Sequence, residues 1–192
     1  MLRILAVYGT THGQTRKVAD AIAEALGADG IIADVREAGR AAPPADGYAA
    51  VVVAASVHGG TYQKPVMRWV KANALALNRM PTAFVSVSLG VLQHDEAVQT
   101  ELKAIAGRFL DATGWRAPLV KQVAGALPYT KYNWFLRRMM KRIAARAGGD
   151  TDTSRDYEYT DWNDLACFAR QFGRRVADHV SPAAAVGHAV AS

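Results

Sequence analysis

A parallel sheet of five strands with helices packed on both faces is the fold that the sequence predicts. Five short apolar runs alternate with segments whose apolar residues recur at helical spacing, and this alternation is typical of parallel strands joined by right-handed crossovers. The chain has 192 residues, of which 51% are hydrophobic and 21% charged, as expected for one globular domain. We therefore predict an α/β three-layer sandwich over residues 1–180.

Each strand is predicted from an apolar run bounded by turn residues, and each helix from apolar residues three or four positions apart. The expected strands cover residues 2–7, 31–35, 49–55, 82–88 and 119–127. The expected helices cover residues 18–26, 65–74, 96–112 and 161–179. Gly27 and Gly30 are expected to end the first helix, and Pro65 to lie in the first turn of the second. Thr160 or Asp161 is expected to cap the last helix.

Residues 128–159 interrupt the alternation and predict an insertion between the fifth strand and the last helix. Six basic and no acidic residues lie between Pro128 and Ala147, which equals the net charge of +6 of the whole chain. As a helix over 132–147, this segment would carry two unlike sides. The apolar side would hold Phe135, Leu136, Met139, Met140, Ile143 and Ala147. The basic side would hold Trp134, Arg137, Arg138, Lys141 and Arg142.

A basic amphipathic helix is typical of an element that lies on a membrane surface or binds a partner. The alternative is that its apolar side packs on the domain and its charges are only solvated. Residues 181–192 have no periodicity and predict a disordered tail.

The composition excludes several classes of site. With one cysteine, Cys167, the chain has no internal disulfide or multi-cysteine cluster, and we expect this thiol to be buried on the last helix. The five histidines lack the spacing of metal ligands, so we expect no metal. Asp150 and Asp152 are expected to form turns. The first apolar stretch is too short for a secretory signal, and no apolar run approaches the ~18 residues of a membrane span. We therefore expect a cytoplasmic protein whose membrane contact, if any, is peripheral.

The turn after the first strand has the composition of an anion site. Hydroxyl groups and free N–H groups at the start of a helix favour negative charge there. The turn has no Gly-Lys-Ser/Thr of nucleoside triphosphatases and no three-glycine dinucleotide motif. A small loop of this kind suits a single terminal phosphate such as that of FMN, although a simple capped helix start would also explain it. The expected phosphate ligands are Thr10, Thr11, His12, Gly13, Gln14 and Thr15.

Two further loops predict the rest of a flavin site. One follows the third strand and has adjacent glycines, which let a flat ring approach the main chain; it contributes Ser56, Val57, His58, Gly59, Gly60 and Tyr62. The other follows the fourth strand and contributes Ser88, Leu89, Gly90, Val91 and Leu92. We expect Tyr62 or His58 to lie against the ring, with a solvent-exposed loop histidine as the alternative for His58.

Six short stretches give the sequence a specific resemblance. They are THGQTR (11–16), AASVHGGTY (54–62), MPTAF (80–84), AGAL (124–127) with Tyr129 and Tyr132, GGDTDT (148–153) and YTDW (159–162). The chain resembles the flavodoxins and, more closely, the flavodoxin-like menaquinone-dependent protoporphyrinogen oxidases of bacterial haem synthesis. The later stretches are not shared with ordinary flavodoxins. This resemblance implies the strand order 2-1-3-4-5, with FMN at the switch point between the first and third strands.

The resemblance also implies an activity: FMN-dependent oxidation of protoporphyrinogen IX to protoporphyrin IX, with the electrons passed to a membrane quinone, menaquinone or ubiquinone. The basic helix would then meet the anionic inner face of the cell membrane, and its arginines would grip the substrate propionates. The expected substrate and membrane residues are Tyr129, Tyr132, Trp134, Arg137, Arg138, Lys141 and Arg142. No catalytic acid or base is predicted.

One departure from the family pattern concerns the face of the ring. Flavodoxins usually place an aromatic residue from the loop after the fourth strand over the flavin, whereas residues 88–96 contain no aromatic ring except that of His94. This face is then either open for a large flat substrate or covered by the insertion. Two other functions remain open: an electron carrier without its own activity, which we would expect to be acidic, and a membrane-associated domain whose flavin site has decayed. No nucleic-acid motif appears.

Overall fold

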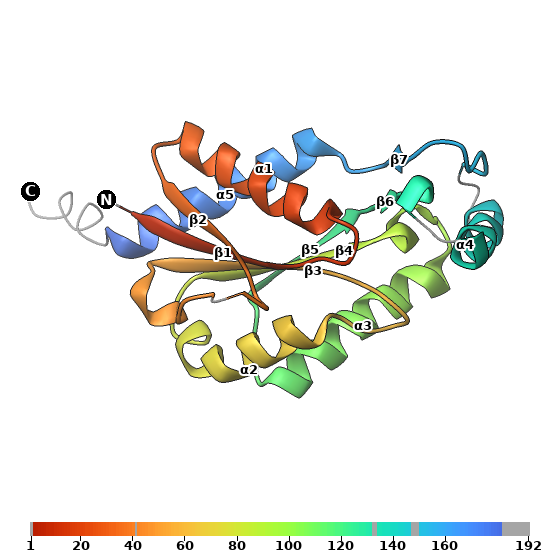
Figure 1. The fold of residues 1–192 in the computed structure, drawn as a ribbon. Coiled ribbons are helices and arrows are strands. Elements are labelled where there is room, and N and C mark those ends of the chain that lie inside the picture. The colour runs from red at the N-terminus through yellow and green to blue at the C-terminus, as the bar shows by residue number, and fades with distance from the viewer. Residues whose placement is uncertain (1, 41, 132–133, 147–149, 182–192) are drawn as a thin grey trace, which may run out of the picture.

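The computed structural model describes residues 2–40, 42–131, 134–146 and 150–181, and these form three layers (Figure 1). The central layer is a five-stranded parallel sheet in the order β2-β1-β3-β4-β5, which confirms the predicted topology. Its strands are β1 (Arg3–Gly9), β2 (Ile32–Glu37), β3 (Ala50–Ser56), β4 (Thr82–Ser88) and β5 (Leu119–Ala124).

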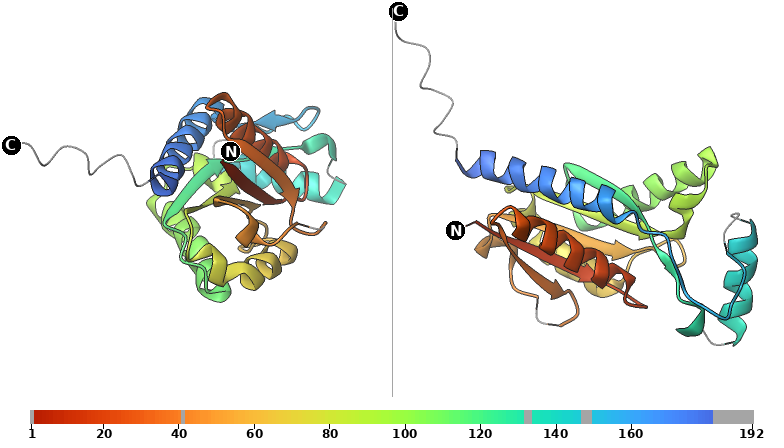
Figure 2. Two further views of the ribbon diagram at one scale, coloured as in Figure 1. Left: turned by 90° about the vertical axis from the view of Figure 1, so that its left-hand side faces the viewer. Right: turned by 90° about the horizontal axis from the view of Figure 1, so that it is seen from above.

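Helices cover both faces of this sheet (Figures 1 and 2). The two on one face are α1 (Gln14–Ala28) and α5 (Trp162–Val180), and those on the other are α2 (Lys64–Leu77) and α3 (Glu96–Thr113). The central strand β3 is buried on both sides, because Val52 and Ala54 face the first helix pair while Val51 and Val53 face the second. Burial on two faces explains why this strand is a continuous apolar run.

The helix ends follow local sequence signals. Asp161 caps α5 by accepting a hydrogen bond of 2.9 Å from the N–H of Asp164, and Pro65 lies in the first turn of α2. Gly30 follows α1 with a positive φ of 76°, as predicted, whereas Gly27 lies inside that helix and does not end it. The segment before β3 contains a short 3-10 helix, η1 (Ala45–Gly47).

The fifth strand is shorter than predicted, because the chain changes partner at Gly125. The N–H of Gly125 donates to Ser88, and its carbonyl accepts from the N–H of Tyr159. Beyond this residue, β6 (Ala126–Leu127) pairs antiparallel with β7 (Tyr157–Glu158) in a separate two-stranded sheet. The insertion therefore leaves and rejoins the domain as a ribbon at the carboxyl edge of the main sheet.

Two elements lie between the strands of that ribbon: η3 (Tyr129–Lys131) and α4 (Trp134–Arg146). Helix α4 stands beyond the carboxyl edge of the sheet, at the end opposite the start of β1 and the end of α5 (Figures 1 and 2). It contacts the ribbon through Ala144, which is buried with Leu127 and Tyr129. The residues predicted to form the apolar side of this helix are not among those whose side chains the structure describes.

The prediction that Cys167 is buried is wrong. Its side chain is exposed on α5, where it accepts a hydrogen bond of 3.3 Å from Gln171. The buried side of α5 is formed by Leu165, Ala169 and Phe172, and position 167 faces away from that stripe. Among the described residues, no helix is long and apolar enough to cross a membrane. The predicted tail falls outside the described residues, except for Ser181.

Candidate functional site

A cavity of about 860 Å³ opens at the carboxyl ends of β1, β3, β4 and β5. Its walls come from the β1–α1, β3–α2 and β4–α3 loops and from the ribbon of the insertion. This is the switch point of the strand order, where ligands of such sheets bind, and the volume lies within the ~300–1,000 Å³ of small-molecule sites. The three loops predicted to form one site are thus brought together.

The β1–α1 loop has the features of an anion site. Gly13 precedes α1 with φ of 96°, a conformation open to glycine, and its N–H donates to Oγ1 of Thr10 at 2.9 Å. Oγ1 of Thr15 is buried and has no hydrogen-bond partner among the described residues. Because an unpaired buried hydroxyl is costly, this atom fits a ligand that would pair with it. The loop residues that line the cavity are Thr10, His12, Gly13, Gln14 and Thr15.

Thr11 is the exception in this loop. It is exposed and does not line the cavity, and its hydroxyl accepts a hydrogen bond of 3.3 Å from Gln63. Its side chain is thus directed toward the start of α2, and its role toward a phosphate stays a prediction.

The β3–α2 loop turns tightly at the mouth of the cavity. The main chains of His58 and Thr61 exchange two hydrogen bonds, of 2.8 and 3.2 Å, across Gly59 and Gly60, whose φ values are 57° and 75°. Positive φ at both central residues is the geometry of a tight hairpin turn and favours glycine. Ser56, Val57, His58 and Gly59 line the cavity as predicted, whereas Gly60 does not.

Tyr62 is a core residue, and the prediction that it faces the ring is wrong. Only 3% of its surface is exposed, and its ring packs edge-on against Phe84 and Phe109. Its hydroxyl shares a hydrogen bond of 2.7 Å with Ser86 on β4, and burial raises the pKa of the phenol above its usual 10.0. After the tight turn the chain leads into α2, so the Tyr62 side chain lies in the core between the sheet and the α2–α3 pair.

The β4–α3 loop begins with a 3-10 helix, η2 (Leu89–Leu92). Ser88, Leu89 and Gly90 line the cavity, and Oγ of Ser88 is a second buried hydroxyl without a partner among the described residues. Val91 and Leu92 do not line it, and Val91 packs against the core on the α2–α3 face. The structure therefore does not bring these two residues to the cavity, and their role toward the ring stays a prediction.

Two histidines meet at the cavity. The rings of His12 and His58 are edge to face, with 5.9 Å between their centroids. Desolvation lowers the pKa of His12 below 6.5, and the nearby Lys131 ammonium lowers it further. Desolvation and the neighbouring His12 lower the pKa of His58. Both imidazoles are therefore neutral at pH 7 and able to accept a proton.

The insertion supplies a wall that the sequence did not assign to particular residues. It contributes Gly125, Ala126, Pro128, Lys131, Asp156, Tyr157 and Glu158. The insertion thus borders the cavity, and whether it covers the flavin face that lacks an aromatic loop residue stays a prediction. Lys17, Val87 and Leu102 also line the cavity and were missed, since no local signal separates them from ordinary helix and strand residues.

Three contacts join this wall to the start of α1. Lys17 forms an ion pair of 2.6 Å with Glu158, and Gln14 donates a hydrogen bond of 2.9 Å to Thr160. Nζ of Lys131 lies 3.5 Å from the main-chain oxygen of His12. The anion-binding loop and the insertion therefore form one continuous surface.

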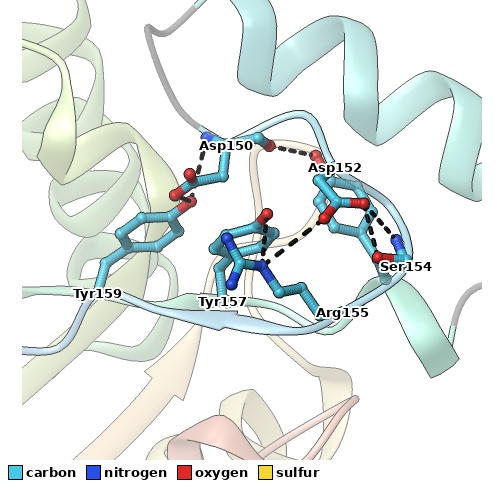
Figure 3. Close-up of polar contacts among 7 residues, drawn as sticks. Asp150, Asp152, Ser154, Arg155, Tyr157 and Tyr159 are labelled. Carbon is cyan, nitrogen blue, oxygen red and sulfur yellow. Dashed lines mark hydrogen bonds and ion pairs between the residues drawn. The ribbon is translucent and has the colours of Figure 1, made fainter.

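A polar network fixes the returning strand of the insertion (Figure 3). The hydroxyl of Tyr159 donates to the carboxylate of Asp150 at 2.7 Å, and burial together with this bond raises its pKa to about 12. Nε of Arg155 donates to the hydroxyl of Tyr157 at 3.0 Å. Asp152 accepts two hydrogen bonds from Ser154 in a tight turn, which confirms its predicted role. Together these contacts hold Tyr157 at the cavity wall.

The predicted substrate and membrane residues differ in exposure. Tyr129 is fully buried and donates to the carbonyl of Asp150 at 2.8 Å, so its prediction as a surface contact is wrong. Nε of Arg137 donates to the carbonyl of Tyr129 at 3.0 Å. Trp134 is 75% exposed, and the other exposed residues of this set on α4 are Arg138, Lys141 and Arg142. Tyr132 lies outside the described residues. None of the described residues of α4 lines the cavity.

Comparison with known proteins identifies the family. The model of the flavodoxin domain matches residues 5–154. Protoporphyrinogen IX dehydrogenase [quinone] of Escherichia coli K12 is 39% identical over 171 residues, which cover 88% of this chain and 94% of the relative. This chain belongs to the flavodoxin-like family of quinone-dependent protoporphyrinogen IX dehydrogenases. The Leishmania major enzyme of the same name is 33% identical over 174 residues, covering 88% of this chain and 74% of the relative.

Solved structures support the fold of this family member. An archaeal flavodoxin aligns with a TM-score of 0.55 and 12% identity over 92% of this chain and 99% of its own. Flavodoxin 1 from Bacillus cereus aligns with a TM-score of 0.54 and 14% identity over 90% of this chain and 97% of its own. At such identities the likeness shows the fold alone. Fold and family together identify the chain as a flavoprotein of the oxidoreductase class. Among the described residues, no three His, Cys, Asp or Glu side chains are placed to hold a metal.

Proposed function

We propose that this protein oxidises protoporphyrinogen IX to protoporphyrin IX with bound FMN and passes the electrons to a membrane quinone. The observation that carries the proposal is the cavity at the switch point, bordered by the three flavodoxin loops and closed on one side by the insertion. The Escherichia coli relative named for this reaction aligns with 88% of this chain, a span that takes in the insertion. The substrate and the acceptor are inferred from their names.

FMN is the flavin that fits the residues present. The N–H groups at the start of α1 and the hydroxyl of Thr15, which has no partner among the described residues, would hold its phosphate. The main chain at Gly59 and the segment from Ser88 to Gly90 would frame the ring. Bound there, FMN would supply the redox chemistry, taking up hydrogen from the substrate and releasing electrons to the quinone. The chain's contribution is to orient the two reactants and exclude water.

The two histidines of the cavity are candidate proton acceptors. Oxidation of a porphyrinogen releases protons as well as electrons. His12 and His58 border the cavity, and the lowering of their pKa values favours the neutral imidazole, the form with a free nitrogen that can take up a proton. This assigns them proton uptake only, and the redox step belongs to the cofactor.

Helix α4 is proposed to rest on an anionic lipid surface, which places the protein at the inner face of the cell membrane. Trp134 is 75% exposed, and Arg138, Lys141 and Arg142 are exposed on the same helix. An exposed indole with basic neighbours is typical of helices that lie at a membrane surface. Because α4 stands beyond the carboxyl edge of the sheet (Figure 1), such contact would bring the cavity side of the protein near the lipid and its quinone.

An electron carrier without activity of its own is the alternative function. The chain has a net charge of +6, and its segment from Pro128 to Ala147 holds six basic and no acidic residues, which is opposite to what we expect of a carrier that docks on basic partners. The charge therefore favours the enzyme.

The deciding experiment is an anaerobic assay of the FMN-loaded protein with protoporphyrinogen IX, followed by porphyrin fluorescence. We expect porphyrin to form faster than in the protein-free control, and only when a menaquinone analogue is present. No porphyrin formation, with the flavin still reducible by other donors, would leave the electron carrier as the function.

A further inference from the structure

We propose that Lys131 of the insertion is a ligand of the cofactor phosphate, so that the insertion selects FMN over flavins that lack a phosphate. The inference rests on the proposed FMN site. It goes beyond it by giving the insertion a role in holding the cofactor, in addition to any role toward substrate or membrane.

Lys131 is positioned at the anion-binding loop. It lies at the end of η3, and its Nζ is 3.5 Å from the carbonyl oxygen of His12, which is in the middle of that loop. Lys131 lines the same cavity as Gly13 and Thr15. The buried hydroxyl of Thr15, without a partner among the described residues, independently marks this end of the cavity as the place for a hydrogen-bonding ligand.

Among the described basic residues near the loop, Lys131 is the one available to pair with a phosphate. Residues 10–15 include no lysine or arginine. Lys17 also lines the cavity, but Glu158 neutralises it at 2.6 Å. Within the part of the chain that the structure describes, Lys131 forms no ion pair, although its ammonium contributes to lowering the pKa of the nearby Asp156 carboxyl. A phosphate monoester carries about −1.5 to −2 charges at pH 7, and burial of that charge is much less costly beside a cation.

Hydrogen bonds fix the main chain around Lys131, so the position of this residue does not depend on a bound ligand. The carboxylate of Asp156 accepts hydrogen bonds from both the N–H and the hydroxyl of Thr130, at 2.9 and 2.8 Å. The N–H of Lys131 itself donates to the carbonyl of Pro128 at 3.0 Å. Asp156, just before β7, thus holds the residue beside Lys131, while the Lys131 side chain reaches the loop at the carbonyl of His12.

The test compares FMN with riboflavin, which has the same ring and ribityl chain but no phosphate. Apo-protein would be titrated with each flavin and binding followed by quenching of flavin fluorescence. The variants are Lys131→Met, Lys131→Arg, which keeps the charge, and Lys103→Met as a control that removes an exposed lysine on α3. We expect Lys131→Met to weaken FMN binding about three- to tenfold, as for a partly exposed charge-assisted contact, and to leave riboflavin binding unchanged.

The outcomes separate this inference from the function on which it rests. Lys131→Arg should retain most of the FMN affinity, Lys103→Met all of it, and the loss in Lys131→Met should shrink at high salt. Equal FMN binding by wild type and Lys131→Met would overturn the inference, as would equal weakening for both flavins, which would mean a structural role. Failure of the wild type to bind FMN at all would instead refute the proposed function.

Discussion

The side chain of Gln14 donates a hydrogen bond of 2.9 Å to the hydroxyl of Thr160, a residue 146 positions away in the chain. The Thr160 hydroxyl donates in turn to the carbonyl of Ala124 at 2.7 Å. This relay joins the start of α1, the approach to α5 and the end of β5 behind the cavity. The two hydrogen bonds therefore hold these three segments in fixed positions behind the cavity.

Replacement of Thr160 by Val should destabilise the protein. Thr160 is only 8% exposed, so loss of its hydroxyl leaves the Gln14 amide and the Ala124 carbonyl without a buried partner. The expected loss is about 1–3 kcal/mol in the free energy of unfolding, measured with urea on the apo-protein. Thr160→Ser keeps the hydroxyl and should retain most of the stability. Equal midpoints and slopes for Thr160→Val and wild type would contradict the relay.

Two neighbouring threonines should behave differently toward FMN. Thr15→Val removes a buried hydroxyl at the cavity that has no partner among the described residues, so FMN affinity should fall about tenfold while the apo-protein loses no stability. Thr11→Val removes a hydroxyl outside the cavity and should leave FMN affinity unchanged. Flavin fluorescence titrations of both variants test this. A larger effect at Thr11 than at Thr15 would refute the geometry of the loop.

Tyr62→Phe should affect stability and not the flavin. The variant deletes the hydroxyl that shares a buried hydrogen bond of 2.7 Å with Ser86, which is itself fully buried. We expect the free energy of unfolding to fall by about 1 kcal/mol and the dissociation constant for FMN to stay the same, because Tyr62 does not line the cavity. If the variant changed the flavin affinity or the visible absorption spectrum but not the stability, Tyr62 would have to contact the flavin ring.

The stability of the apo-protein should decrease as the pH falls below 6.5. The fold lowers the pKa of His12 and His58 from the 6.5 of an unfolded chain, so protonation favours the unfolded state. This contribution is constant above pH 6.5 and is lost as the pH falls toward the folded pKa values. Free energies of unfolding between about pH 7.5 and 5.5 would measure it. His12→Gln combined with His58→Gln should flatten the slope, and an unchanged slope would argue against neutral histidines.

Removal of the exposed charges of α4 should release the protein from anionic vesicles. Each basic residue near such a surface contributes about 1 kcal/mol, so the triple variant Arg138→Gln, Lys141→Gln and Arg142→Gln should bind at least about tenfold more weakly in a vesicle sedimentation assay. The matched control replaces Lys71, Lys103 and Arg116, which are exposed on the α2–α3 side, by Gln. FMN should stay bound in both. If the wild type does not bind vesicles, or both triple variants lose binding equally, the role of α4 is refuted.

The sequence by itself determined where the five main strands lie along the chain, the helices between them and the three loops at one edge of the sheet. Those features follow from local patterns: an apolar run for each doubly buried strand, helical spacing for each amphipathic helix, and glycines or hydroxyls where the chain turns. The carboxyl ends of parallel strands meet at one edge, so the position of the cavity also followed. The resemblance of six short stretches added the family.

The tertiary structure decided which side chains face the cavity. Tyr62 and Thr11 stand in the correct loops but point into the core and toward α2, because tight turns set side-chain direction through backbone angles that no local pattern reveals. The change of partner at Gly125 was hidden in a continuous apolar run, since strand pairing is a long-range contact. For the same reason Lys131 could not be assigned to the loop of His12, which lies 119 residues before it. Only folding brings these two together.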